Sequence, residues 1–163
     1  MFDTKHTLVA LVEDKPGVLT RIAGLIRRRG FNIQSLAVGC SEQPGLSRMT
    51  VVVSGDSTEV EQVRKQLEKL INVVRVSDIT EEAIVSRELA LIKVNSTAST
   101  RSEIMQIVDI FRANIVDVSS NSVTVEVTGD DDKVESLIEL LRSFGIKEIT
   151  RTGRVALTRG RKS

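Results

Sequence analysis

The stretch LVALVEDKPGVL, residues 8–19, decides how this chain begins to fold. Its nearly continuous apolar run over residues 8–12 predicts a buried strand at 6–13. The turn DKPG at residues 14–17 ends that strand, because Pro and Gly punctuate regular structure. Apolar residues then recur at helical spacing over residues 18–29, which predicts an amphipathic helix. A buried strand therefore leads through a tight turn directly into a helix.

The same order of elements recurs in the two halves of the chain. The first half continues with predicted strands at 31–40, 47–54 and 72–78, and with a helix that starts after the N-cap Asp56 and runs to Leu70. Residues 80–87 predict a linker, and the second half gives strands at 88–94, 114–119, 123–128 and from 146 into a basic tail, with helices at 99–113 and 130–144. Both halves have the order βαββαβ, so we expect an α+β fold of two ferredoxin-like domains in tandem, residues 1–79 and 80–163.

One face of each predicted sheet lacks a helix to cover it. In strand 47–54, Met49, Val51 and Val53 share one face, yet Val52 on the other face is apolar as well. Domains of about 80 residues bury only a modest part of their surface, which makes association attractive. We therefore expect the sheets to extend or stack across a homodimer.

The composition favours a binding or regulatory protein over an enzyme. With 23 Lys and Arg against 22 Asp and Glu, the net charge of +1 gives little attraction to nucleic acid or to an anionic membrane. His6 and Cys40 are the only His and Cys, which are too few for a His/Cys metal cluster. Glycine-rich phosphate loops are absent from the sequence, and four Phe without Trp or Tyr leave no base-stacking platform. We expect no catalytic, metal or cofactor site in this chain, and no nucleic acid as a partner.

The cysteine count also indicates a compartment. A single cysteine cannot form an intrachain disulfide, which fits a reducing cytoplasm. The N-terminus has no basic-then-apolar signal pattern, and the apolar runs are too short to span a membrane. We expect a cytoplasmic protein without a membrane partner.

The turn at residues 14–17 is the one loop with the design of a binding site. The first N–H groups of the following helix have no partner within it, and the helix dipole adds positive charge there. Gly17 lets a ligand approach the backbone, so the N–H groups of Gly17, Val18 and Leu19 could hold a small carboxylate. The carboxamide of Asn32 could accept from an ammonium group and donate to a carboxylate, which suits an amino acid. Pro16-Gly17 could equally serve only to start the helix, and Asn32 could be an ordinary turn residue.

Other polar residues have simpler interpretations. Cys40 is most simply a small buried apolar residue, and His6 a surface or cap residue. The run Asp130-Asp131-Asp132 lies at a predicted helix start, where acids complement the dipole, although a metal site is an alternative. The basic stretch 147–163 is either a solvated tail or a surface that docks onto an acidic partner.

Several motifs in order carry a resemblance to a known family. The pair DxPGVL at 14–19 and GFNI at 30–33 is similar to that of ACT domains, which are small amino-acid-sensing modules. Further along, SLAVG (35–39), LSRMT (46–50), VSD (76–78), RELALIKV (87–94), FRANIVDV (111–118) and TRG (158–160) recur in the order found in one family. Together they resemble the small regulatory subunits of acetolactate synthase (acetohydroxyacid synthase), over nearly the whole chain.

The resemblance implies a function. Such a subunit activates a large catalytic subunit, which condenses two 2-oxo acids with thiamine diphosphate, Mg²⁺ and FAD, and it confers feedback inhibition by valine in branched-chain amino-acid synthesis. It also implies a homodimer with effector at the interface of paired ACT domains, and a C-terminal domain that engages the large subunit. By position the effector residues are Asp14, Gly17, Val18 and Leu19 of one chain with Asn32 and neighbouring Ile33 of the other.

The apolar character of Val12 favours valine over serine as effector, because serine-binding relatives have a polar residue there. Leucine and isoleucine differ from valine by one methylene, about 1–3 kcal/mol, so the sequence does not rank them. The alternative is a free-standing ACT-type sensor that regulates another enzyme. A ferredoxin-like nucleic-acid binder or an independent enzyme would need exposed aromatics or a catalytic set that the sequence does not supply.

Overall fold

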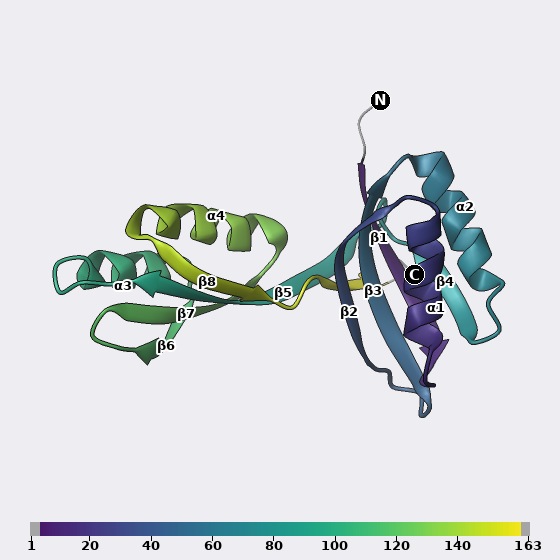
Figure 1. Cartoon of the computed structure of the whole chain (residues 1–163), viewed down its shortest axis with the longest axis horizontal. Coiled ribbons are helices and arrows are strands. Elements are labelled where there is room, and N and C mark those ends of the chain that lie inside the picture. The colour runs from purple at the N-terminus through teal and green to yellow at the C-terminus, as the bar shows by residue number, and fades with distance from the viewer. Residues whose placement is uncertain (1–3, 161–163) are drawn as a thin grey trace. The chain divides into compact units, whose positions relative to one another are not determined.

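The computed structural model describes residues 4–160, which form two compact units (Figure 1). The first unit runs to Val85 and takes in the chain again from Arg154, and the second spans Ser86–Gly153. Of the predicted basic tail, Arg161 and Lys162 lie outside the described residues.

The first unit contains the predicted βαββαβ order. Its elements are β1 (Thr4–Glu13), α1 (Val18–Arg28), β2 (Asn32–Cys40), β3 (Leu46–Gly55), α2 (Ser57–Glu68) and β4 (Val73–Asp78). The strands lie in the order β2-β3-β1-β4, and each neighbouring pair is antiparallel. Gly17 ends the turn before α1 in the left-handed region, and Asp56 caps α2 by accepting from the N–H of Thr58 at 2.8 Å. The ferredoxin-like prediction is confirmed for this unit.

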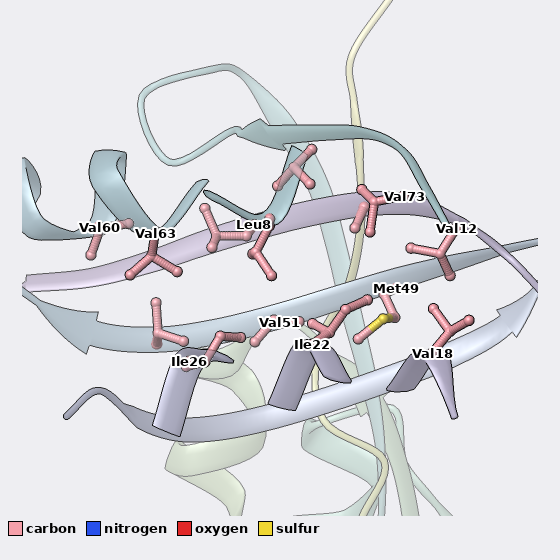
Figure 2. Close-up of a cluster of buried hydrophobic side chains, with 14 residues drawn as sticks. Leu8, Val12, Val18, Ile22, Ile26, Met49, Val51, Val60, Val63 and Val73 are labelled. Carbon is pink, nitrogen blue, oxygen red and sulfur yellow. The ribbon is translucent and has the colours of Figure 1, made fainter. Parts of the chain in front are cut away.

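The core of the first unit lies between the sheet and its two helices. Alternate residues of β1 and β3 point to the helices and are almost fully buried. Figure 2 shows Val18, Ile22 and Ile26 of α1 packed against this face, with Met49 and Val51 of β3 opposite them. These helix residues recur every four positions, which is the amphipathic stripe that the sequence predicts.

The helix-free face of this sheet is partly covered by the chain's own C-terminal segment. Arg154 donates from Nη1 to Oγ1 of Thr7, which lies on that face, at 2.8 Å. Thr7 and its register partner Val52 are only 2% and 4% exposed. The short strand β9 (Val155–Thr158) pairs with β5 and buries Ala156. The apolar Val52 therefore does not by itself require a partner molecule.

The second unit repeats the fold. Its elements are β5 (Ile84–Asn95, which begins in the first unit), α3 (Arg101–Ile110), β6 (Asn114–Val118), β7 (Ser122–Gly129), α4 (Asp131–Leu141), the 3₁₀ turn Arg142–Phe144 and β8 (Ile146–Arg151). The order β6-β7-β5-β8 is again antiparallel, and alternate residues of β5 and β7 pack on both helices. The tandem arrangement predicted from the sequence is confirmed.

The unit boundaries differ from those predicted, 1–79 and 80–163. The expected linker 80–87 already becomes strand at Ile84, and the chain returns to the first unit at Arg154. The described part of the basic tail is also not simply solvated. Arg151 pairs with Glu88 and with Glu135 at 2.5 Å, and burial of Glu88 makes these ion pairs part of the second unit's framework. Ion pairs with residues distant in sequence therefore hold Arg151 in the fold, although the basic composition alone suggests a solvated tail.

Candidate functional site

The turn between β1 and α1 presents an uncapped helix start. Gly17 has φ 86° and ψ −12°, and no described side chain caps this end of α1. A Cβ on Gly17 would meet nothing within 4 Å, so the approach to the first helical N–H groups is open. The N–H of Val18 donates to the carbonyl of Lys15 at 3.4 Å, whereas the other first N–H groups have no acceptor within the helix, and all of them lie at the positive end of its dipole. The local chemistry is therefore that of an anion site of carboxylate size.

Contacts from two other turns hold this loop in place. The N–H of Asp14 donates to the carbonyl of Gly45 at 2.9 Å, and the N–H of Glu13 donates to the carbonyl of Asn72 at 2.8 Å. The side chain of Asn72 donates to Glu13 Oε2 at 3.1 Å and accepts from Nη1 of Arg21 at 2.8 Å. Sequence reasoning missed these residues, because Asn72 lies far along the chain and no local pattern signals its contact.

The two adjacent acids of the loop have different environments. Lys15 donates to Glu13 Oε2 at 2.9 Å, and this bond, followed by the one from Asn72, lowers the pKa of Glu13 below its usual value. The exposed Asp14 carboxylate has no partner among the described residues. Glu13 is thus engaged within the fold, whereas Asp14 remains available to an ammonium group.

Asn32 and Ile33 lie at the start of β2, which is an edge strand. Asn32 is exposed opposite Ser54, and Ile33 is half-buried opposite Val53. The length of α1, about 16 Å at 1.5 Å per residue, separates them from Gly17. One chain therefore does not bring the two groups of predicted site residues together.

The structure places Val12, the apolar residue expected to favour valine, in the core of the first unit. Val12 is 3% exposed and lies in the core with Val18, at the end of the cluster shown in Figure 2. Its side chain packs in the same cluster as Val18, the first residue of the helix. Val18 is 4% exposed and offers only its backbone, whereas Leu19 is 43% exposed and presents the apolar surface beside the turn.

The remaining candidates resolve into structural roles. His6 is buried and bonds through Nδ1 to Asp78 and through Nε2 to Thr4, each at 3.0 Å, so its expected surface position is wrong. Cys40 is exposed at the end of β2 and is not a buried residue as expected. Asp130 accepts from the N–H of Lys133 at 3.0 Å and is the N-cap of α4, so the acidic run lies at a helix start as expected.

Two further features concern the described part of the chain. Within it, no three His, Cys, Asp or Glu side chains gather closely enough to hold a metal ion. Within residues 4–160, no helix has the length and apolarity needed to cross a membrane.

Comparison with known sequences decides the family. Residues 8–75 match the family described as "AHAS small subunit-like ACT domain", and residues 87–160 match "Small subunit of acetolactate synthase". The chain belongs to the family of acetolactate synthase small subunits. A probable acetolactate synthase small subunit of Archaeoglobus fulgidus is 60% identical over 97% of this chain and 99% of its own length. The acetolactate synthase small subunit of Mycobacterium bovis is 56% identical over 95% of this chain and 92% of its own.

A solved structure confirms that this chain has the fold of an acetolactate synthase small subunit. The crystal structure of the acetolactate synthase small subunit from Thermotoga maritima is similar with a TM-score of 0.88 and 46% sequence identity. The match covers 98% of this chain and 99% of that one. The resemblance stated from the motifs is therefore confirmed, including the ACT character of the first unit.

Proposed function

We propose that this small subunit activates a large, thiamine-diphosphate-dependent catalytic subunit and makes it sensitive to inhibition by valine. Membership of the small-subunit family implies a larger partner. The single observation that supports amino-acid sensing is the open, uncapped start of α1 at Gly17, with the unpaired carboxylate of Asp14 beside it. These groups match the carboxylate and the ammonium of an amino acid.

The proposed recognition uses two copies of the chain. The N–H groups of Gly17, Val18 and Leu19 would hold the valine carboxylate, and Asp14 would accept from its ammonium. Asn32 of a second copy would complete the polar contacts. The isopropyl group would lie against Leu19, which is 43% exposed, and against Ile33 of the second copy. Two copies are needed because α1 separates the two groups within one chain.

The edge strand β2 supports a homodimer as the working form. An edge strand leaves backbone N–H and C=O groups unpaired on one side, and association of two edges satisfies them. Pairing two copies through β2 would bring Asn32 of one near the site of the other. The first unit would then bind effector and dimerise, and the second would engage the large subunit.

Inhibition would follow from linkage between two equilibria. Valine favours the arrangement of paired first units in which both groups of residues contact it. If the large subunit prefers another arrangement, valine and activation oppose each other by an equal coupling free energy, typically about 1–3 kcal/mol.

The chemistry itself would belong to the partner. Thiamine diphosphate, Mg²⁺ and FAD would reside in the large subunit, and the expected compartment is the cytoplasm. The acids of the present chain fit this division, because Glu13, Glu88 and Asp78 are engaged with Lys, Arg or His side chains of the fold.

The test is reconstitution with the large subunit of the same organism. Acetolactate formation should rise when the chain is added and fall again with valine, and leucine and isoleucine measure selectivity. Asn32→Ala should abolish inhibition and retain activation. Asn114→Ala is the matched control, since Asn114 also starts the second strand of its unit and is exposed.

Each other outcome counts against a part of the proposal. Neither activation nor a valine response would contradict it. Valine binding without activation would favour the free-standing sensor. Loss of both functions in Asn32→Ala would contradict a separable effector site.

A further inference from the structure

The end of β3 holds a glycine on which an aromatic ring lies directly. A Cβ on Gly55 would stand 2.0 Å from Cε1 and 2.5 Å from Cδ1 of Phe31. Gly55 follows Val53 on the face of the sheet that carries the helices, because residues two apart share a face. The Phe31 ring therefore occupies the space that a side chain at position 55 would take.

This contact lies next to the second group of proposed effector residues. Phe31 immediately precedes Asn32, and Asn32 pairs with Ser54, the neighbour of Gly55. Gln34 donates from Nε2 to Oγ of the same Ser54, at the point where the register of β2 shifts. The contact of the ring with Gly55 and the pairing with Ser54 thus both hold the first residues of β2 in place.

We propose that Gly55 and Phe31 form a positioning pair that fixes Asn32 for effector binding. The ring packs against the core of the first unit and is half-buried. The ring also lies against the backbone of Gly55. This contact fixes the position of the Phe31 backbone relative to β3. The next residue, Asn32, then lies on the opposite face of the sheet, where its side chain is exposed. The inference deepens the proposed function and rests on it.

A methyl group at position 55 cannot be accommodated by small adjustments. The contact distances of 2.0 and 2.5 Å lie far inside the ordinary separation of about 3.5–4 Å between carbons. Either the ring moves and carries the start of β2 with it, or the ring rotates out alone. The first response displaces Asn32, and the second leaves it in place. Effector affinity distinguishes the two.

The experiment measures valine inhibition of the reconstituted enzyme for four variants. Gly55→Ala should raise the valine concentration for half inhibition about tenfold or more and retain activation. This size is expected because the variant would lose one well-placed hydrogen bond to a charged group. Gly24→Ala is the matched control, because Gly24 lies in α1 and not in the proposed dimer strand, has nothing within 4 Å of its Cβ position and should respond as wild type.

Rescue separates positioning from a general loss of structure. Phe31→Leu should weaken the valine response several-fold, since the smaller side chain no longer reaches Gly55. The double variant Phe31→Leu/Gly55→Ala should recover most of the loss seen in Gly55→Ala, because the new methyl and the smaller side chain share the same space. Phe31→Leu alone also tests the proposal if Gly55→Ala fails to fold.

The outcomes are distinct. Wild-type inhibition in Gly55→Ala or in Phe31→Leu would overturn the positioning pair and leave the proposed function standing. A double variant no better than Gly55→Ala would also overturn it. Absence of any valine response in the wild-type complex would contradict the proposed function, and the positioning role would fall with it.

Discussion

Removal of the Arg154 guanidinium should lower the free energy of unfolding of the first unit by about 2 kcal/mol. In Arg154→Met the aliphatic stem remains, but the bond from Nη1 to Thr7 Oγ1, 2.8 Å long, is lost. A hydrogen bond from a charged donor contributes about 1.5–3 kcal/mol. Thr7 is 2% exposed, so water reaches its hydroxyl only if the C-terminal segment moves away.

A double-mutant cycle isolates this contact. Thr7→Val keeps the shape of the side chain and removes the acceptor, so the guanidinium loses that partner. Combined with Arg154→Met, the change should cost less than the sum of the two single changes by about 1–2 kcal/mol. The residues are distant in sequence, so the coupling reports on the folded state alone.

Urea unfolding followed by far-ultraviolet circular dichroism is the suitable assay, because the chain has no Trp or Tyr for fluorescence. A loss of about 2 kcal/mol should also lower Tm by about 10 °C for a unit of this size. Lys147→Met is the control, since Lys147 is exposed on β8. If Arg154→Met unfolds like this control, or if the coupling is below about 0.5 kcal/mol, the C-terminal segment does not stabilise the first unit as argued.

Two further predictions concern the turn before α1 and the stability of the first unit at low pH. Gly17→Ala should cost about 1–2 kcal/mol, because Gly17 has φ 86° where a Cβ is strained, and it should weaken valine inhibition; unchanged Tm and inhibition would contradict this. Burial alone raises the pKa of Asp78, but hydrogen bonds from Thr80 and His6 outweigh it and hold the pKa below its usual value. A lowered carboxyl pKa stabilises the fold above about pH 4 and loses that effect as pH falls through the lower folded value. Asp78→Asn should therefore have a lower urea midpoint than wild type near neutral pH, and the difference should vanish toward pH ~2; a constant difference would refute the assignment.

Most of the fold could be predicted because its signals are local. The alternation in β3 and β7 and the helical spacing in α1 and α4 each extend over enough residues to define one face. The short strand β9 could not be predicted, since four residues carry no decisive period. Its position depends on Arg154 reaching Thr7, a contact between opposite ends of the chain.

The candidate site also has a part that local sequence predicts and a part that depends on distant contacts. The open helix start at Gly17 is a property of one short stretch, so the sequence predicts it. The support from Asn72 and Gly45 comes from turns elsewhere in the chain and has no local pattern. The burial of Val12 has the same origin, because its apolar character is visible in the sequence whereas its place in the core is set by packing.

In the proposed site, different side chains would provide support and recognition, and this division would make regulation separable from folding. Glu13 and Asn72 use their polar groups on each other, and Val12 uses its side chain in the core. Asp14 and Asn32 are exposed, and among residues 4–160 neither side chain makes a hydrogen bond or an ion pair. Changes to the first set should therefore alter stability and effector response together, because the loop loses its anchors. Changes to the second set should alter effector response with little effect on unfolding, as for exposed residues in general, about 0.5 kcal/mol or less. A small subunit built in this way can change its effector without rebuilding the fold that positions it.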